Sequence, residues 1–411
     1  MTIPRTVVVV GSSIGGVRTA QALRSEGFDG RIVLVGEEPD LPYDKPPLSK
    51  QFLAGSWDVD RVALLTAEAA GAAGIELRLG VRAQRLDIAG REVILANGDA
   101  VPFDVVVLAT GAAARPSPWS AESGVHVLRS LTDSRALHVD LERDAPVVVV
   151  GGGFIGAEVA ATAHGLGRQV TVVDPLQAPI GRVVGSDIGE HFTELHHRHG
   201  VHTRFGVGVE SVTGRAGSLT VRLTDGTELG AGTVVVGIGA SPNDGWLQSS
   251  GLLVENGVTC DQYCRAVDSA DVYAVGDLVR WFHPAHDEHV RVEHWTNAVD
   301  SATVVAHNIV HPGNLRAHNP VEYVWSDQYD WKVQIVGLPA LATEHRLTGE
   351  LTGASARAAV LYTDDSRQLR GAVTVNWPKA LVTCRRLMVA GTTFEDALAQ
   401  IAALAPRAAA P

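Results

Sequence analysis

The sequence predicts an α/β protein in which two parallel-sheet domains are followed by a smaller α+β domain. The chain has 411 residues, 45% of them hydrophobic, and single hydrophobic cores stop growing at roughly 250–300 residues. A pattern of strand, glycine-rich turn and helix occurs twice, near residues 6–35 and 147–174. From about residue 319, short strand patterns separated by turn residues replace it.

Composition and charge disfavour several classes of function. The net charge of −12 argues against nucleic-acid binding and against attraction to anionic membranes. The sequence has no apolar run near the ~20 residues that cross a bilayer. Its N-terminus lacks the basic region and long apolar run of a signal peptide. We therefore expect a soluble, cytoplasmic protein with neither nucleic-acid nor membrane partners.

The first β-α-β unit begins with an apolar strand at residues 6–10. A glycine-rich turn starting at Gly11 leads into a helix-like run over residues 14–26, and a second buried strand covers residues 31–35. Glu37 follows that strand. In dinucleotide sites an acid in this region accepts hydrogen bonds from the ribose hydroxyls.

The turn "GSSIGG", residues 11–16, is compatible with two functions. It matches the G-x-S-x-G elbow of a hydrolase, with Ser13 as the nucleophile. It also matches the phosphate-binding turn G-x-G-x-x-G, with Ser13 in place of the second glycine. Both motifs join a strand to a helix, so the local pattern does not decide between them.

The second unit carries the complete phosphate-binding pattern. Residues 147–150 form an apolar strand that runs into Gly151, Gly153 and Gly156, and after a helix the next strand ends at Asp174. One such turn is a weak signal. Two turns, each in a β-α-β context with an acid after the second strand, indicate an internal duplication and predict that one chain binds two dinucleotides.

Three further strands end in small residues. The stretches 103–111 and 232–243 each close a segment that holds one glycine turn, and we interpret them as crossover points between the two domains. The stretch 271–277 is another buried strand, and its terminal Asp277 is placed to accept a hydrogen bond from a ribityl hydroxyl. Capping of a helix is the alternative role of Asp277.

The C-terminal part is expected to fold separately. "EYVWSDQYDWKVQIVG", "ARAAVLYTD" and "QLRGAVTVNW" are typical of antiparallel strands. Helices are expected around residues 378–389 and near 394–403.

The sequence predicts no metal site and no redox-active thiol pair. Its three cysteines include no C-x-x-C, and we expect Cys260 and Cys264 to be small packing residues. A cluster of histidines in "LHHRHGVH" straddles a predicted helix end and has no carboxylate at ligand spacing. We expect a solvated helix end there, comprising His196, His197, His199 and His202.

Taken together, the motifs resemble the FAD-dependent pyridine-nucleotide oxidoreductases of the glutathione-reductase superfamily. Within that superfamily they are most similar to the NADH-dependent ferredoxin reductases that serve oxygenases and cytochromes P450. The resemblance rests on both glycine turns and on "PYDKPPLSK", "ATG", "VHVLRSLTDS", "GIGASPN", "VYAVGD", "RVEHWTNA" and "WSDQYD". It implies two Rossmann-like nucleotide-binding domains, for FAD and NAD, plus a C-terminal α+β domain. The expected boundaries are 1–111 with 241–318 for FAD, 112–240 for NAD and 319–411 for the C-terminal domain.

The resemblance decides between the two interpretations of the first turn. A hydrolase elbow needs a catalytic acid and a histidine at neighbouring strand ends, and those ends here carry flavin and second-nucleotide motifs. Ser13 is therefore a variant of the second glycine, small enough for a pyrophosphate to approach. The residues that the resemblance assigns to FAD are Gly11, Ser13, Ile14, Gly15, Gly16, Glu37, Glu38, Lys45, Pro46, Lys50, Arg82, Ala83, Ala109, Thr110, Gly111, Arg115, Gly276, Asp277, Glu293, His294, Trp295 and Trp325.

For NAD, the carboxylate of Asp174 favours NADH. It can accept hydrogen bonds from both ribose hydroxyls and would repel the 2′-phosphate of NADPH. No cation follows before Arg182. Capping of the next turn is the alternative role of Asp174. The residues assigned to NAD are Gly151, Gly153, Phe154, Ile155, Gly156, Glu158, Asp174, Gly237, Ile238 and Gly239.

By the same resemblance, three side chains serve the reaction directly. Lys50 is implied to lie near the reactive edge of the flavin, paired with Glu158, and Trp325 to lie near the flavin face. Trp295 is implied to lie beside the pyrimidine end of the flavin, at a helix N-terminus. The alternatives are a structural ion pair between domains for Lys50 and Glu158, and a packing role for Trp325.

The implied activity is hydride transfer from NADH to FAD, followed by single-electron transfer to a [2Fe–2S] ferredoxin that feeds a P450 or another oxygenase. Disulfide reductases of the superfamily have C-x-x-x-x-C where this chain has "YDKPPLSK", so dithiol chemistry is not expected. The alternatives are an NADH oxidase, a rubredoxin or nitrite reductase, and a non-enzymatic redox-responsive flavoprotein similar to the apoptosis-inducing factors. Candidate docking residues for an acidic ferredoxin are Lys332, Lys379, Arg385 and Arg386.

Overall fold

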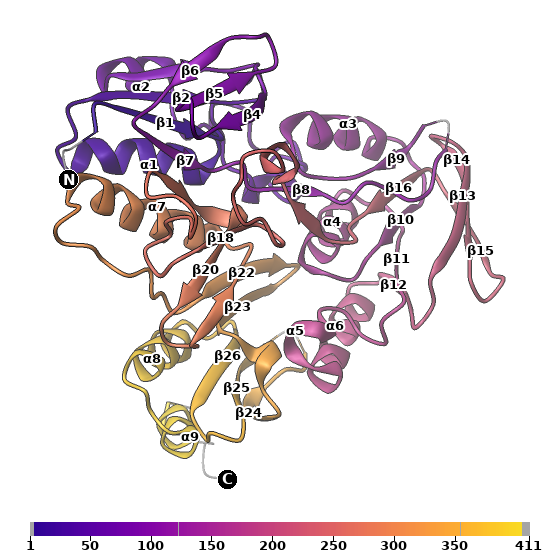
Figure 1. Cartoon of the computed structure of the whole chain (residues 1–411). Coiled ribbons are helices and arrows are strands. Elements are labelled where there is room, and N and C mark those ends of the chain that lie inside the picture. Colours follow the sequence, from indigo (N-terminus) through magenta and orange to yellow (C-terminus); the bar gives the residue numbers. More distant parts are fainter. Residues whose placement is uncertain (1–3, 122, 354, 405–411) are drawn as a thin grey trace. The chain divides into compact units, whose positions relative to one another are not determined.

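The computed structural model describes residues 4–121, 123–353 and 355–404, and it divides into two compact units (Figure 1). Unit 1 consists of Met1–Lys45, Asp58–Ala113 and Ala240–Pro320. Unit 2 consists of Pro46–Trp57, Ala114–Gly239 and Val321–Pro411. Among the described residues, no helix has both the length and the apolar character that a membrane span requires.

Unit 1 is built on a five-stranded parallel sheet with the order β3-β2-β1-β7-β19. Its central strand is almost completely buried, because helices cover parallel sheets on their faces. Helices α1 and α7 pack closely against each other (Figure 1). The bounds are β1 (Thr6–Val10), α1 (Ile14–Ser25), β2 (Arg31–Val35), β3 (Ile75–Arg78), β7 (Val105–Leu108), β19 (Val272–Ala274) and α7 (Trp295–Val310).

Smaller elements complete unit 1. An antiparallel sheet β4-β5-β6 is inserted before β7, and a second three-stranded sheet has the order β18-β20-β21. Strands β8 and β17 pair where the chain leaves the unit and returns to it. The bounds are α2 (Ala67–Ala72), β4 (Ala83–Asp87), β5 (Glu92–Leu95), β6 (Ala100–Pro102), β8 (Ala112–Ala114), β17 (Ala240–Pro242), η2 (Gly245–Leu247), β18 (Val258–Cys260), η3 (Gly276–Leu278), β20 (Val279–His283) and β21 (Glu288–Val290).

Unit 2 contains a second parallel sheet with the order β12-β11-β10-β16-β9. The antiparallel sheet β13-β14-β15 is inserted before β16, as β4-β5-β6 is before β7. The bounds are η1 (Pro46–Ser49), β9 (Val125–His126), α3 (Leu131–Leu141), β10 (Val147–Val150), α4 (Phe154–Gly165), β11 (Val170–Asp174), α5 (Gly181–Val184), α6 (Ser186–Arg198), β12 (His202–Phe205), β13 (Val209–Arg215), β14 (Ser218–Leu223), β15 (Glu228–Ala231) and β16 (Thr233–Val236).

The C-terminal part of unit 2 is an antiparallel sheet with the order β22-β23-β26-β25-β24. Helices α8 and α9 pack on it through a core around Trp377 and Phe394. The edge strand β24 was not predicted, because its mostly polar residues give no apolar signal. The bounds are β22 (Tyr323–Gln328), β23 (Trp331–Gly337), η4 (Pro339–Leu341), β24 (Glu344–Glu350), β25 (Arg357–Thr363), β26 (Leu369–Val375), α8 (Pro378–Val389) and α9 (Phe394–Ala402).

The histidine cluster differs from its predicted structure. His196 is completely buried, and its Nδ1 lies 2.8 Å from the Tyr329 hydroxyl. Burial lowers the pKa of His196 to about 4. The prediction of a solvated helix end is therefore wrong for His196. This residue shares the inward face of the amphipathic helix α6 with Phe192 and Leu195.

Candidate active site

The first glycine turn is set against backbone on two sides. Gly11 has a φ of +116°, and a Cβ on it would lie 2.1 Å from the carbonyl oxygen of Ala109. A Cβ on Gly16 would lie 1.8 Å from the carbonyl oxygen of Gly11. Both positions therefore require glycine, and α1 starts directly beside β1. The first N–H groups of α1 have no partner within the helix and can donate to an anion at the turn.

Ser13 occupies a position that admits a side chain. It is the N-cap of α1, with φ of −90° in the extended region, and its hydroxyl makes no capping hydrogen bond in the described part of the chain. The equivalent residue of the second turn is Gly153, and no described atom lies within 4 Å of a Cβ there. The second glycine of the pattern can thus be replaced by serine without a clash.

Glu37 does not occupy the position in unit 1 that Asp174 occupies in unit 2. Val35 pairs with Val10 as Val173 pairs with Val150, so Gly36, rather than Glu37, is the equivalent of Asp174. The Glu37 side chain is 69% exposed and lies 3.8 Å from the Arg82 guanidinium. Both side chains are open to a ligand beyond the strand end.

Further predicted FAD residues lie in the segment that follows β2. Tyr43 donates a hydrogen bond to Glu38. The Lys45 ammonium lies 3.4 Å from the Glu38 carboxylate and 4.8 Å from the centre of the Tyr43 ring. These contacts hold the Lys45 ammonium close to the segment that follows β2.

The two crossovers are tied together in unit 1. The Thr110 hydroxyl donates to the Asn243 carbonyl at 2.9 Å, and the Asn243 amide donates to the Thr110 carbonyl at 2.9 Å. Asn243 also donates its backbone N–H to Gly111. In unit 2, the backbone N–H of Arg115 donates to the Gly239 carbonyl at 2.9 Å.

The turn at Gly276 and Asp277 is held by α7. The Ser301 hydroxyl accepts from the Gly276 N–H at 3.1 Å, and the Asn297 amide donates to the Gly276 carbonyl at 3.2 Å. A Cβ on Gly276 would lie 3.3 Å from the Ala298 Cβ. Close packing of this turn on the helix therefore depends on glycine.

The N-terminus of α7 carries the "EHW" residues. His294 is the N-cap, and Trp295 is the first helical residue. The Trp295 indole N–H donates to the Asp44 carboxylate at 2.8 Å, which fixes the ring. Glu293 lies 2.9 Å from the Arg291 guanidinium.

The second glycine turn repeats the first. Gly151 has a φ of +109°, and its Cβ would lie 2.2 Å from the Gly237 carbonyl oxygen. A Cβ on Gly156 would lie 1.9 Å from the Gly151 carbonyl oxygen. Ile155 and Ile238 beside the turn are 45% and 37% exposed. Exposed aliphatic side chains at such a turn provide apolar surface for a nucleotide. The neighbouring Phe154 begins α4.

Asp174 is anchored at the end of β11. Its carboxylate accepts the Gly152 N–H at 2.7 Å and the Leu176 N–H at 2.8 Å. The predicted alternative, capping of the next turn, is thus present in the structure. It does not exhaust the carboxylate, because each oxygen can accept a second hydrogen bond.

Glu158 is the centre of a buried polar group in unit 2. The Lys50 ammonium lies 2.8 Å from its carboxylate, and the two side chains are 13% and 5% exposed. The Ser326 hydroxyl donates to the other carboxylate oxygen at 2.8 Å, and the Ser49 hydroxyl donates as well. Ser49 and Ser326 were not predicted from the sequence, although they directly adjoin Lys50 and Trp325.

Lys50 is positioned by contacts that are distant in sequence. The Ser134 hydroxyl of α3 donates to the Leu48 carbonyl at 2.8 Å, and the Thr162 hydroxyl of α4 donates to the Ser49 carbonyl at 2.7 Å. These bonds attach residues 46–57, which begin at Pro46 of η1, to unit 2. The ion pair of Lys50 with Glu158 therefore lies within one unit.

Trp325 lies on β22 beside Ser326, and its ring stacks on Tyr323 with a centroid distance of 6.0 Å. Ala83, another predicted FAD residue, starts β4 and is 7% exposed.

Trp325, Lys50 and Glu158 belong to unit 2, whereas the residues of the first glycine turn belong to unit 1. The residues of both turns fit a dinucleotide, since the tight glycines and the helix N-termini form cradles for a pyrophosphate.

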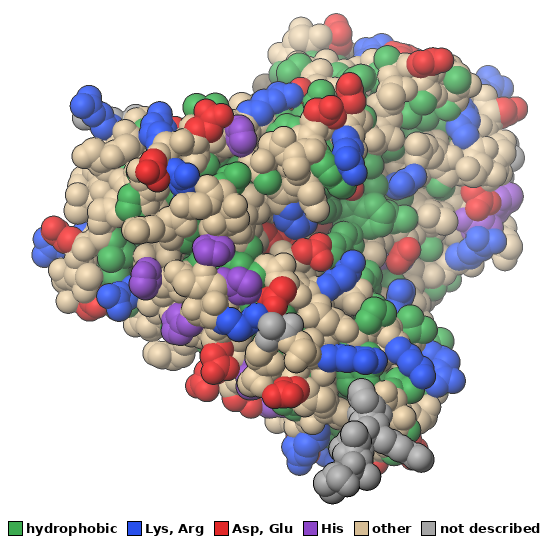
Figure 2. Space-filling view, turned by 180° about the vertical axis from the view of Figure 1, so that it is seen from behind, with side chains coloured by type: hydrophobic (Ala, Val, Ile, Leu, Met, Phe, Trp, Pro, Cys, Tyr) green, Lys and Arg blue, Asp and Glu red, His purple; other side chains and the backbone are tan. Residues whose placement is uncertain are grey.

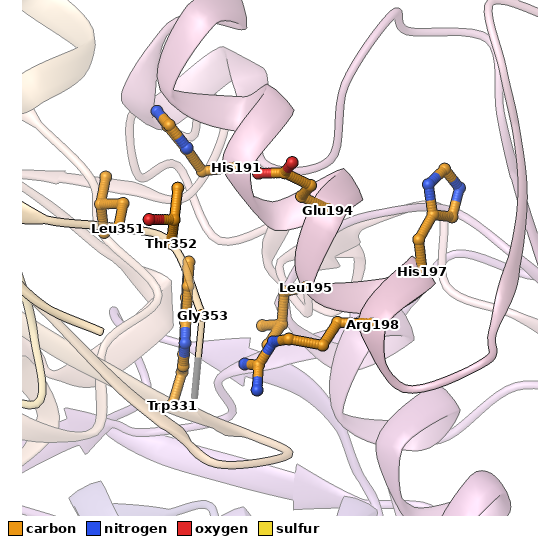
Figure 3. A pocket seen from close by; sticks show the side chains of 9 residues that line it. All are labelled: His191, Glu194, Leu195, His197, Arg198, Trp331, Leu351, Thr352 and Gly353. Atoms are coloured by element: carbon orange, nitrogen blue, oxygen red, sulfur yellow. The ribbon is translucent and has the colours of Figure 1, made fainter. Parts of the chain in front are cut away.

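A cavity of 380 Å³ lies elsewhere in unit 2, between α6, β23 and the loop after β24 (Figure 3). None of its lining residues was predicted to bind a cofactor. They are His191, Glu194, Leu195, His197, Arg198, Trp331, Leu351, Thr352 and Gly353.

Comparisons with known proteins agree with this organisation. The family model described as pyridine nucleotide-disulphide oxidoreductase matches residues 5–302, and the one described as reductase C-terminal matches residues 323–405. Rhodocoxin reductase of Rhodococcus erythropolis is 36% identical, over 93% of this chain and 89% of its own length. The ferredoxin–NAD(+) reductase component of the anthranilate 1,2-dioxygenase system of Burkholderia cepacia is also 36% identical, over 93% and 94%.

Among solved structures, the chain is similar to the reductase in a covalent complex of putidaredoxin reductase with putidaredoxin. The TM-score is 0.89 and the identity 32%, with 94% of this chain and 93% of that chain covered. The predicted fold class is confirmed by this match and by the C-terminal family model. With two thirds of the chain and more matched, the protein belongs to the pyridine nucleotide-disulphide oxidoreductase family.

Proposed function

We propose that this chain is an NADH-dependent ferredoxin reductase with FAD at the first glycine turn and NADH at the second. Its electrons go singly to a [2Fe–2S] ferredoxin that feeds a cytochrome P450 or a Rieske oxygenase. The duplicated turn is the observation that carries the proposal, because each copy has the backbone-tight glycines that a dinucleotide requires. Relatives that are reductase components of oxygenase systems support ferredoxin as the acceptor.

Bound FAD supplies a hydride acceptor for NADH and a donor of single electrons. The protein's own contribution is binding, orientation and electrostatics. Helices α1 and α4 direct their N-terminal N–H groups toward the two pyrophosphate positions. Lys50, held by Glu158, supplies a fixed cation. A cation near a flavin stabilises the negative charge that reduction leaves on the ring.

The thiols support direct release of electrons rather than a dithiol relay. Cys260 and Cys264 are completely buried, and burial raises the pKa of both thiols well above the usual value. Burial also raises the pKa of Cys384 to about 12. Thiols of this kind are inert. All three are unpaired, which is typical of a reducing compartment, and we infer a cytoplasmic location.

The ferredoxin surface is proposed on the C-terminal domain. Lys379, Arg385 and Arg386 are exposed on α8, and Lys332 is exposed on β23. Figure 2 shows Lys and Arg side chains gathered on one face of this domain. Arg385 also stacks on the Tyr323 ring at 5.3 Å. A basic surface of this kind would steer an acidic partner, and its effect should fall as salt is added.

The test is NADH-dependent reduction of purified [2Fe–2S] ferredoxins by the holoenzyme, followed anaerobically and then in air. We expect fast ferredoxin reduction, with a rate that falls steeply as ionic strength rises, and slow oxygen consumption without ferredoxin. Rapid oxygen consumption alone would indicate an NADH oxidase. NADH binding with only slow transfer to every ferredoxin tested would indicate a non-enzymatic redox-responsive flavoprotein. Either outcome contradicts the proposal.

The same assay examines Lys50. Lys50→Ala should slow flavin reduction by about tenfold, which is roughly 1.4 kcal/mol of barrier. Lys50→Arg keeps the charge and should recover most of the rate. Equal rates of flavin reduction in Lys50→Ala and the parent would show that the ion pair is only structural.

A further inference from the structure

Unit 1 contains a group of potential metal ligands at the C-terminal ends of α1 and α7. Glu26 is the C-cap residue of α1, His307 lies in the last turn of α7, and His311 is the C-cap residue of α7. The Glu26 Oε2 atom lies 3.2 Å from His307 Nδ1 and 3.0 Å from His311 Nε2. One carboxylate oxygen and two imidazole nitrogens therefore converge on one point.

The hydrogen bonds of His307 show that a positive charge is favoured where the three side chains meet. Its Nε2 lies 3.0 Å from the backbone carbonyl oxygen of Asn314, which can only accept a hydrogen bond. Its Nδ1 faces the Glu26 carboxylate. A neutral imidazole has one N–H, so with Nε2–H directed at Asn314 the Nδ1 lone pair faces a carboxylate oxygen. A cation between these atoms removes that conflict.

We propose that Glu26, His307 and His311 bind a divalent transition-metal ion of the zinc class, with water as the fourth ligand. Imidazole and carboxylate suit such ions. Ligand atoms about 2.0–2.2 Å from a tetrahedral zinc lie roughly 3.3–3.5 Å from one another. The observed separations of 3.0 and 3.2 Å need to widen by only a few tenths of an ångström. All three ligand atoms lie within 4.8 Å of one another.

The surroundings favour a metal in two further ways. The bond from His307 to the Asn314 carbonyl is the outer contact that typically orients a metal-binding imidazole. The His307 side chain is 3% exposed and the Glu26 side chain 24%, whereas that of His311 is 43% exposed. The site is thus anchored in the interior and open at one ligand, which gives the ion an entry path and leaves room for water.

The ion would join the two helices that carry much of the predicted FAD site. Helix α1 begins at the first glycine turn, and α7 begins at Trp295 and holds the Gly276 turn. Glu26 and His307 are 281 positions apart in the chain. An ion that binds only when both helices are in place stabilises the native state.

The test is calorimetric titration of chelator-treated holoenzyme with Zn²⁺, and with Co²⁺ as a spectroscopic probe. We expect one zinc ion per chain, visible Co²⁺ bands to the red of the flavin absorption, and a rise in the thermal unfolding midpoint. His311→Ala and Glu26→Gln should each weaken zinc binding by at least about a hundredfold. His311 is at a helix end and half exposed, and Glu26→Gln preserves shape, so at least one variant should retain the fold.

The matched control is His345→Ala, which removes a histidine 2.9 Å from a single carboxylate, Asp187, in unit 2. It should leave zinc affinity unchanged. The proposal is overturned if the parent takes up no zinc, in which case a proton on His307 satisfies the geometry. It is also overturned if His345→Ala weakens binding as much as His311→Ala does. Flavin content and circular dichroism verify that each variant is folded.

Discussion

The two β-α-β units share one backbone design and differ in the side chains at one position. Gly11 and Gly151 have φ values of +116° and +109°, and each lies against the carbonyl group at the end of a neighbouring strand. Four strands have the same spatial order in the two parallel sheets. In each unit a three-stranded antiparallel sheet precedes the strand β7 or β16 in the sequence. The fifth strand is the exception, since β19 follows the rest of its sheet in sequence and β9 precedes it.

The difference lies where the turn meets the end of the second strand. In unit 1, Ser12 supplies the side chain and Gly36 leaves space for it, because a Cβ on Gly36 would lie 2.2 Å from the Ser12 hydroxyl. In unit 2 the equivalent residues are Gly152 and Asp174, and the Asp174 carboxylate accepts the Gly152 N–H. Each unit thus places one polar side chain there, from opposite sides. Backbone geometry is common to both units, whereas the polar side chain beside the turn is particular to each.

The largest expected effect comes from substituting a glycine that both turns share. Gly156→Ala should destabilise the fold by more than about 3 kcal/mol, because its Cβ would lie 1.9 Å from the Gly151 carbonyl oxygen. Gly16→Ala should do the same in unit 1. Denaturant unfolding of both variants measures this. Similar stability of the parent and either variant would show that the turns are looser than the structure has them.

The next effect concerns Asp174 and the choice of nicotinamide cofactor. We expect kcat/KM for NADH to exceed that for NADPH on the order of a hundredfold, about 3 kcal/mol. The Asp174 carboxylate would accept hydrogen bonds from the ribose hydroxyls of NADH and would repel the 2′-phosphate of NADPH. Asp174→Asn should narrow the preference chiefly by weakening NADH binding. Steady-state kinetics with both cofactors provides the measurement, and equal use of NADPH by the parent would contradict the assignment.

A smaller effect tests whether the two sides of the turn are interchangeable. Gly36→Asp alone should destabilise unit 1 by about 2 kcal/mol, since its Cβ would lie 2.2 Å from the Ser12 hydroxyl and 2.8 Å from the Leu79 side chain. Adding Ser12→Gly recreates the pair found in unit 2 and should recover at least half of the loss. A double-mutant cycle on unfolding free energy gives the coupling. Additive effects of the two substitutions would mean that they do not share one space.

Much of the architecture followed from local pattern. Runs of buried β-branched residues, such as Val7–Val10, together with glycine turns, predict parallel strands and their helices. The predicted fold class and family are confirmed. The edge strand β24 was not predicted because the residues of Glu344–Glu350 are mostly polar and form no apolar face. Its partner strand β25, rather than its own composition, fixes it in the sheet.

The candidate site was predictable where a motif carries the chemistry and not where distant segments meet. Lys50 and Glu158 were paired by resemblance, but Ser49 and Ser326 complete the buried group through contacts that no local pattern encodes. Spacing alone identified Glu37 as the acid of unit 1, whereas strand register makes Gly36 the equivalent of Asp174. The proposed metal site of Glu26, His307 and His311 likewise depends on the packing of α1 against α7.

The central claim, that one turn holds FAD and the other takes NADH, is tested most directly by a matched pair of carboxylates. Ser13→Asp and Gly153→Asp place a negative charge at each pyrophosphate position, and aspartate is a favourable N-cap, so the helices are retained. The uncharged controls are Ser13→Asn and Gly153→Asn. The measurement is flavin content per chain together with the anaerobic rate of flavin reduction by NADH.

We predict that Ser13→Asp lowers FAD content at least about tenfold, by charge repulsion. Gly153→Asp should retain one FAD per chain and slow reduction by NADH at least about tenfold, with both asparagine variants close to the parent. Loss of FAD in Gly153→Asp, or normal FAD and NADH reactivity in both aspartate variants, would contradict the assignment of the two turns.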